Sequence, residues 1–250
     1  MSRKRGKPRA LLGEIARLYP ELEDPGMAIA RGRVLVNGFP VTNVAARVPA
    51  DASLRLRVDR PLRGSAKLRA ALDAFAVSVV GRTAVDVGAA AGGFTRVLLE
   101  AGAERVYAVD VGYGQLVGSL RGDERVVVLE RVNVAELAAS LVPEVVEIIA
   151  IDVSYLGVAA VAPQLEALRI DGDADCIALV KPMYELQLAR PPADDARLQR
   201  AVDAAARGLA ATGWHVAGAI RSPELGSRGA VEFLLHASRA PRGSRRRGGA

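Results

Sequence analysis

The sequence predicts an α/β protein: a mostly parallel, doubly wound sheet preceded by a small α+β domain. Between residues 65 and 237, short apolar segments alternate with segments of helical spacing, an order typical of a parallel sheet covered by helices. In addition, 250 residues with 50% apolar and 25% charged composition suffice for one large and one small domain with buried cores.

The N-terminal residues 1–59 predict the small domain. Residues 10–19 and about 22–31 have the apolar spacing of helices. Residues 34–41, VLVNGFPV, predict a short strand and an Asn-Gly turn, and SLRLRV (53–58) alternates as a half-exposed strand does. The stretch RPLRG (60–64) has the Pro and Gly of a linker.

Residues 65–238 predict the large domain, which begins with a helix in SAKLRAALDAFAV. The apolar strands expected to form its parallel sheet are TAVDV, RVYAVD, RVVVL, VEIIAID and DCIALVK. WHVAGAI and VEFLLHA follow as two strands separated by a single turn region. We therefore expect the last strand to be antiparallel to its neighbour.

Several classes of protein are disfavoured by composition. No apolar run approaches the roughly 20 residues that cross a bilayer, and the basic N-terminus lacks the apolar core of a secretory signal. Cys176 is the only cysteine and is expected to be a buried strand residue. His215 and His236 lie in apolar strands without metal-ligand spacing, so no metal site is expected. We expect a cytoplasmic protein.

The net charge of +6 is unevenly divided along the chain. Residues 1–69 carry 15 Lys/Arg against 6 Asp/Glu, and residues 239–250 carry 5 Arg and no acid, which leaves residues 70–238 with a net charge of −8. Basic ends favour an anionic polymer as partner, because phosphate contacts give affinity independent of sequence. For the tail 239–250, a disordered and merely solvated segment is an equally good interpretation.

A glycine-rich loop follows the first strand of the large domain. It is spaced D-x-G-x-x-x-G-G, from Asp86 through Gly88 to Gly92 and Gly93. The G-x-G-x-x-G of a dinucleotide site is absent. A loop of small residues beside a carboxylate suits S-adenosylmethionine, which has an amino group, a carboxylate and a sulfonium to place but no phosphate. The alternative is that the glycines only allow close packing of strand and helix.

Polar residues also end the next strands of the predicted sheet. Asp110, at the end of the second strand, can accept hydrogen bonds from both ribose hydroxyls of a nucleoside cofactor. Asn133, after the third, can pair with the adenine edge. Asp152 ends the fourth strand and Lys181 the fifth, at the sheet edge where ligands of α/β proteins lie.

Lysine is rare in this chain: four lysines stand against thirty arginines, and Lys67 and Lys181 are two of the four. Arginine stays protonated near neutral pH, whereas a lysine stripped of water can lose its proton and act as a base for a hydroxyl. Lys67 lies on the helix before the first strand, and Glu232 lies on the last strand. Alone, Glu232 would be read as a solvated strand residue.

The order Lys67, Asp152, Lys181, Glu232 resembles that of the FtsJ-like RNA 2′-O-methyltransferases. More closely, the chain is similar to the hemolysin A, or TlyA, family of rRNA methyltransferases, through the segments SAKLRAALDAF, DVGAAAGGFT, VYAVDVGYGQL, IIAIDVSY, LVKPMYE and SPELGSRGAVEFLL. The front segment AIARGRVLVNGFPV resembles the S4-like RNA-binding fold of that family. The likeness spans roughly residues 10–238, and its most specific element is DVGYGQL.

The resemblance implies a Rossmann-like methyltransferase sheet that uses S-adenosylmethionine to methylate a ribose 2′-hydroxyl of ribosomal RNA. It implies that Lys181 accepts or polarises the hydroxyl proton. It also implies that Asp152 and Lys67 set the proton affinity and the orientation of Lys181, and that Glu232 holds the far side of this group of side chains. Positioning would supply most of the rate enhancement. The expected partner is ribosomal RNA or a ribosomal subunit, with no membrane, and a monomer is favoured.

The same motifs predict further site residues. The matching segments add Phe94, Tyr113, Gln115 and Asp152 to the expected cofactor contacts, although Tyr113 can equally be a packing residue. Tyr155 and Tyr184 follow Asp152 and Lys181 closely enough to stack on the target base, or simply to pack. Trp214 is expected in the core.

Two alternatives remain open. The chain can be an RNA-binding protein that keeps the fold but has lost catalysis, since its loop reads GAAAGG where the family usually has a Ser-Thr pair. It can also be a membrane-active hemolysin, although no basic amphipathic helix is visible.

Overall fold

A computed structural model of the protein describes residues 7–57, 62 and 64–239. The chain divides into two compact units, Met1–Arg60 and Pro61–Ala250, each of which we describe by itself. The predicted linker is described only at Leu62 and Gly64, and the predicted basic tail only at Arg239. The remainder of both segments lies outside the described residues.

The N-terminal unit packs two short helices against small antiparallel sheets. Its elements are β1 (Arg9–Ala10), α1 (Leu11–Leu18), α2 (Pro25–Ala30), β2 (Val34–Val36), β3 (Phe39–Val41), β4 (Arg47–Val48) and β5 (Leu54–Leu56). The strands pair in the orders β3-β2-β5 and β1-β4. Asn37 and Gly38 have φ of 52° and 89°, the left-handed pair that a tight Asn-Gly hairpin requires. Leu11, Ile15 and Ile29 form the centre of its core.

The larger unit contains a seven-stranded sheet and its helices. The strands are β6 (Thr83–Val87), β7 (Arg105–Asp110), β8 (Val126–Glu130), β9 (Val146–Ile151), β10 (Ile170–Val180), β11 (His215–Arg221) and β12 (Phe233–Ser238). The helices are α3 (Ser65–Phe75), α4 (Gly93–Glu100), α5 (Gly118–Arg121), α6 (Val158–Val161), α7 (Pro182–Glu185) and α8 (Asp195–Ala211). Three 3₁₀ turns complete it, at Val134–Glu136, Ala162–Ala167 and Ser227–Gly229.

The strand order of this sheet is β11-β12-β10-β9-β6-β7-β8. Strand β12 is antiparallel to both of its neighbours, and the other pairs are parallel. This confirms the predicted fold class of a mostly parallel sheet with an antiparallel last strand.

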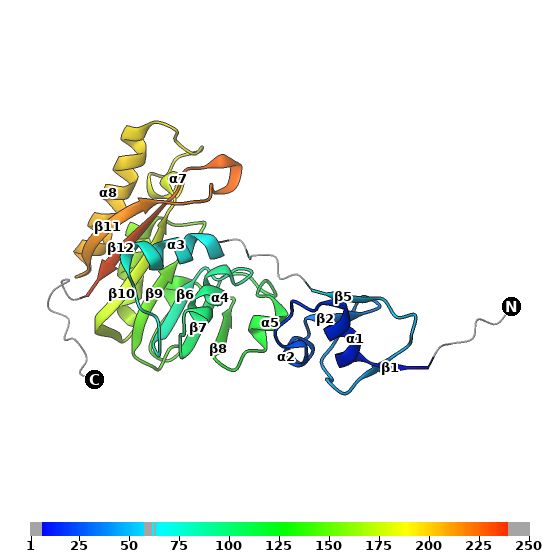
Figure 1. Cartoon of the computed structure of the whole chain (residues 1–250). Coiled ribbons are helices and arrows are strands. Elements are labelled where there is room, and N and C mark those ends of the chain that lie inside the picture. Colours follow the sequence, from blue (N-terminus) through cyan, green and yellow to red (C-terminus); the bar gives the residue numbers. More distant parts are fainter. Residues whose placement is uncertain (1–6, 58–61, 63, 240–250) are drawn as a thin grey trace. The chain divides into compact units, whose positions relative to one another are not determined.

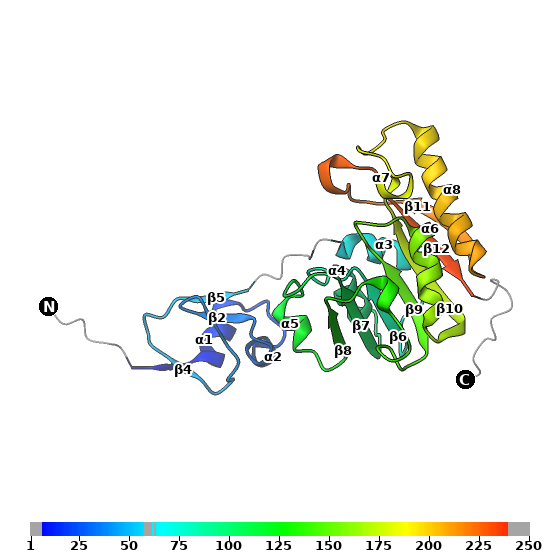
Figure 2. The same ribbon diagram turned by 180° about the vertical axis from the view of Figure 1, so that it is seen from behind.

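Alternate residues of each strand bury opposite faces of the sheet. Ala84 packs in the same core as α3 and α4, whereas Val85 packs in the core shared with α6 and α8. Figures 1 and 2 show these helix pairs on the two faces. Because both faces are covered, the central strands are apolar at successive positions rather than at every second one.

The topology fixes where a ligand can lie. Strand β6 is central: the chain continues to β7 and β8 on one side and then crosses to β9 on the other. Such a switch point opens a crevice at the carboxyl ends of the strands. Val87 is in register with both Val109 and Ile151, so Gly88, Asp110 and Asp152 emerge at one level.

Candidate active site

Two adjoining cavities open at this edge of the sheet. The larger, of about 920 Å³, is lined by the loop after β6, the ends of β9 and β10, the start of α3 and the segment between β11 and β12. The smaller, of about 230 Å³, lies at the ends of β7 and β8. Both are lined by Gly88, Ala90, Gln115, Asp152 and Ser154, so the two cavities form one continuous site.

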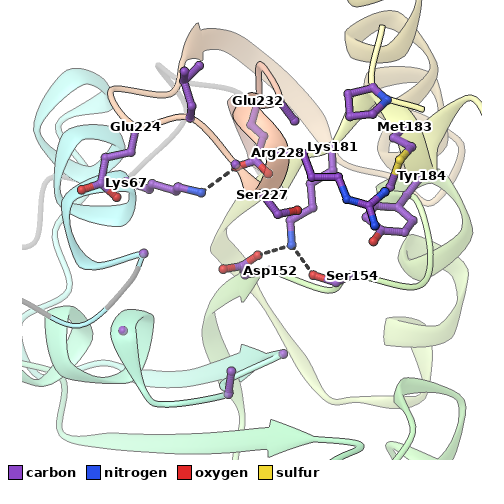
Figure 3. Close-up of a pocket in the computed structure, with 18 of the residues that line it drawn as sticks. Lys67, Asp152, Ser154, Lys181, Met183, Tyr184, Glu224, Ser227, Arg228 and Glu232 are labelled. Atoms are coloured by element: carbon purple, nitrogen blue, oxygen red, sulfur yellow. Dashed lines mark hydrogen bonds and ion pairs between the residues drawn. The ribbon is translucent and has the colours of Figure 1, made fainter. Parts of the chain in front are cut away.

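Lys181 and Asp152 form an ion pair in the larger cavity. The Lys181 Nζ lies 2.6 Å from Asp152 Oδ1 and donates to Ser154 Oγ at 2.6 Å, as Figure 3 shows. The side chains of Lys181 and Asp152 are 14% and 24% exposed, so the pair is sheltered but open to the cavity. Adjacent parallel strands bring these residues together, although 29 positions separate them in the chain.

Lys67 and Glu232 form a second and more deeply buried ion pair. The Lys67 Nζ donates to Glu232 Oε2 at 2.6 Å, and the two side chains are 7% and 6% exposed. The carboxylate fits because residue 226 is glycine: a Cβ there would lie 2.0 Å from Glu232 Oε1. Lys67 thus pairs with Glu232 in the cavity that Lys181 and Asp152 also line, and its expected effect on Lys181 stays a prediction.

The glycines of the loop serve different purposes. Gly88 has φ of +94°, and a Cβ on it would lie 2.5 Å from the carbonyl oxygen of Asp152, so the loop passes against the end of β9. Gly93 lines the larger cavity, as does Phe94. Gly92 has φ of +96° and packs against Leu120 instead, and it is not among the cavity-lining residues that the structure describes.

Asp86 is fully buried behind the loop. Its Oδ2 accepts a hydrogen bond of 2.6 Å from Thr95 Oγ1, and Oδ1 has no partner among the described residues. Burial raises the pKa of this carboxyl to about 7, opposed by the Thr95 hydrogen bond and reinforced by the charge of Asp152. Within the described part of the chain it lines neither cavity, so its place is beneath the loop rather than on the predicted ligand surface.

Asp110 lines the smaller cavity, as its predicted role requires. Its two carboxylate oxygens accept hydrogen bonds from the backbone N–H groups of Ala90, at 2.9 Å, and Gly112, at 2.6 Å. These bonds orient the carboxylate and join the ends of β6 and β7. Gln115 lies at the boundary of the two cavities.

Asn133 and Tyr113 are not among the described residues that line the two cavities. The Asn133 Oδ1 accepts from Ala135 N at 3.1 Å, and Glu136 Oε2 accepts from Asn133 N at 2.8 Å, a reciprocal capping box. Tyr113 is 69% exposed, with the Arg131 guanidinium 4.3 Å above its ring. In the segment after β8, the described residues that line the smaller cavity are Val132 and Val134.

Sequence reasoning missed Ser154 and Arg228, which both line the larger cavity. Ser154 stands two residues after Asp152, a spacing that could have indicated it. Of the predicted aromatic residues, Tyr184 lines the larger cavity and Tyr155 the smaller.

The remaining predicted residues lie elsewhere. His215 is exposed on β11, and the buried His236 is paired with Asp175 at 2.7 Å. Trp214 is 2% exposed. Cys176 is buried, and burial raises the pKa of its thiol to about 12. Across residues 7–57, 62 and 64–239, no helix is both long and apolar enough to span a membrane.

Comparisons with known proteins agree with this fold and show the family. A family model described as FtsJ-like methyltransferase matches residues 61–239. The 16S/23S rRNA (cytidine-2′-O)-methyltransferase TlyA of Mycobacterium tuberculosis is 40% identical over 238 residues, which cover 88% of each chain. Hemolysin A of Brachyspira hyodysenteriae is 31% identical over 83% of this chain and 90% of its own. A solved structure of a candidate hemolysin from Streptococcus thermophilus is 28% identical, with a TM-score of 0.67, over 93% of this chain and 89% of its own.

Proposed function

The chain belongs to the FtsJ-like methyltransferase family, and from this premise we propose that it methylates a ribose 2′-hydroxyl of ribosomal RNA, with S-adenosylmethionine as methyl donor. The observation that carries the proposal is the pairing of Lys181 with Asp152 in the larger cavity, 2.6 Å apart. The printed name of the Mycobacterium tuberculosis relative supports the substrate, since that protein acts on cytidine 2′-oxygens of 16S and 23S rRNA.

The residues of the site fit S-adenosylmethionine. Asp110 presents a carboxylate to the smaller cavity, next to the apolar Val111, Val132 and Val134, a combination suited to ribose hydroxyls and an adenine ring. Gly88 and Gly93 leave room along the loop between the two cavities. When bound, S-adenosylmethionine supplies an electrophilic methyl group on a sulfonium.

Lys181 is the residue we assign to the hydroxyl proton. Lys181 accepts or polarises this proton when the 2′-oxygen attacks, and Asp152, at 2.6 Å, stabilises the ammonium form of the lysine. Ser154 holds the nitrogen in place through its hydroxyl. An arginine could not take this role, because it keeps its proton near neutral pH.

Lys67 and Glu232 are assigned to the cavity wall. Their buried pair joins α3 to the start of β12 on the side of the cavity away from β9. Because the two charges neutralise each other, this part of the wall carries no net charge that would draw water into the site. This is a positioning role for the pair.

The N-terminal unit is proposed to grip the RNA, as its resemblance to an S4-like domain suggests. Leu54 and Leu56 of β5 pack in the core of the unit, so alternation along the strand places Arg55 and Arg57 on its exposed face. Together with the basic excess of residues 1–69, this face supplies charge for phosphate contacts.

Labelled methyl transfer tests the proposal. Purified small and large ribosomal subunits, from cells that lack the protein, are incubated with the protein and S-adenosylmethionine carrying a tritiated methyl group. We expect label in rRNA that maps to ribose 2′-oxygens and that is lost with Lys181→Ala. Subunit binding without transfer would favour an RNA-binding protein without catalysis, and liposome leakage without either would favour a membrane-active hemolysin.

A further inference from the structure

The charges that line the larger cavity are only partly paired. Its lining includes the charged residues Lys67, Asp152, Lys181, Glu224, Arg228 and Glu232. Four of these form the two ion pairs described above. Within the described residues, Glu224 and Arg228 form no ion pair, and Figure 3 shows their charged groups far apart across the cavity. Arg228 is therefore a free cation on the cavity rim.

The backbone at Arg228 is unfavourable for an arginine. Its φ of 57° and ψ of 27° lie in the left-handed region, which glycine and asparagine tolerate better than long side chains do. The neighbouring Gly229 is left-handed as well, with φ of +73°. A side chain placed at such a position costs free energy, so its presence calls for a reason beyond the turn.

The loop that carries Arg228 is held closed at its base. Gly226 N donates to Ala230 O at 2.8 Å, and Ser222 N donates to Glu232 O at 2.9 Å. Glu232 is in turn fixed by Lys67. The loop is thus anchored to the cavity wall that Lys67 and Glu232 form, and Arg228 is presented to the cavity from a defined backbone position.

We infer that Arg228 binds a phosphate of the RNA next to the ribose that is methylated. This inference rests on the proposed function. A ribose 2′-oxygen and the 3′-phosphate are attached to adjacent ring carbons, so a hydroxyl that reaches Lys181 brings a phosphate into the same cavity. A guanidinium matches phosphate with two parallel N–H donors, and the two internal ion pairs leave no other free cation among the described lining residues.

The position of Glu224 supports the assignment of Arg228 to an RNA phosphate. Figure 3 places its carboxylate on the Lys67 side of the cavity, away from Arg228. A phosphate is repelled from that side and attracted to the other, so the two unpaired charges give the nucleotide a single direction of entry.

The test compares two substitutions at one position. Arg228→Asn removes the charge but suits the left-handed backbone, so the protein should keep its melting temperature. Arg228→Lys keeps the positive charge but loses the two parallel N–H donors of the guanidinium. Equilibrium filter binding to purified ribosomal subunits, over a series of salt concentrations, measures the contact without requiring methyl transfer.

We expect Arg228→Asn to weaken binding about tenfold at low salt and to reduce the slope of log affinity against log salt by about 0.7 to 0.9, the value of one phosphate. Arg228→Lys should keep the slope and recover part of the affinity. The matched control is Arg207→Ala, which removes an exposed arginine of α8 that lies outside the cavity and should change neither quantity.

An unchanged affinity and salt slope in Arg228→Asn would overturn the inference, and so would equal behaviour of the Asn and Lys variants. This outcome differs from failure of the proposed function, which appears as wild-type protein that binds subunits but transfers no methyl group. A wild-type protein without transfer that still shows the Arg228-dependent slope would leave the phosphate contact standing.

Discussion

The amine of Lys181 and the carboxylate of Asp152 meet across two adjacent parallel strands, with Nζ 2.6 Å from Oδ1, and Ser154 Oγ accepts a second hydrogen bond from the same nitrogen. The strands β9 and β10 end at the same sheet edge, so the backbone itself brings the pair together. The predictions below begin from this pair.

Replacing Lys181 should abolish catalysis without loss of the fold. A positioned base contributes about 10²- to 10⁴-fold to the rate, so Lys181→Ala should lower kcat by that factor. Lys181→Arg should be equally inactive, because arginine retains its proton. Single-turnover transfer of labelled methyl groups measures the rate, and calorimetry with S-adenosylmethionine checks that the cofactor still binds. An active arginine variant would contradict the assignment of Lys181 as proton acceptor.

The Lys67–Glu232 pair should act as a unit in stability. Removing one partner of a buried ion pair leaves an uncompensated charge, so Lys67→Met and Glu232→Gln should each lower the free energy of unfolding by about 3 kcal/mol. The double variant should lose much less than the sum. A double-mutant cycle by urea unfolding gives the coupling energy, and additive losses would show that the two side chains act independently.

Gly88→Ala should distort the loop. Its φ of +94° and the 2.5 Å approach of a new Cβ to the Asp152 carbonyl oxygen both oppose a side chain, so we expect a loss of at least about 2 kcal/mol of unfolding free energy and weak cofactor binding. Gly114→Ala is the matched control: its φ is +70°, but nothing lies within 4 Å of a Cβ there. It should cost only about 1 kcal/mol. Similar losses in both variants would mean that the close approach of Gly88 to β9 has no energetic consequence.

Asp86 should make stability fall as pH rises. Its pKa is raised from 3.8 to about 7 in the folded protein, so between these values the folded state binds more protons than the unfolded state. The contribution is therefore complete below about pH 4 and is lost as pH approaches 7, with an upper limit on the order of 4 kcal/mol. Asp86→Asn keeps an acceptor for Thr95 and removes the titration. Urea unfolding of both proteins at pH 5 and pH 8 should show a difference that changes with pH, and a constant difference would contradict the raised pKa.

Much of the larger unit could be predicted because its signals are local. The apolar strands and the helix that begins at Ser65 follow from composition and periodicity, and the family resemblance is confirmed by the match over residues 61–239. The two-residue strands β1 and β4 were not foreseen, since a pairing of that length leaves no periodic pattern.

The site was predictable in its members but not in its pairings. Sequence order placed Asp152 and Lys181 at one sheet edge, and the family resemblance added Lys67 and Glu232. Neither could show that Lys67 pairs with Glu232, because that pairing depends on the path of the loop through Gly226. The capping role of Asn133 was readable from the N-x-x-E spacing to Glu136. Arg228 gave no such signal, because its importance comes from a backbone angle and a cavity that exist only in the folded chain.

The link between Lys67 and Glu232 also orders events during synthesis. During translation, Lys67 leaves the ribosome 165 residues before Glu232 does. Until β12 has emerged and joined the sheet between β10 and β11, the nascent polypeptide has no finished pocket. A chain truncated before β12 therefore lacks this wall of the pocket, and we expect it to transfer no methyl groups.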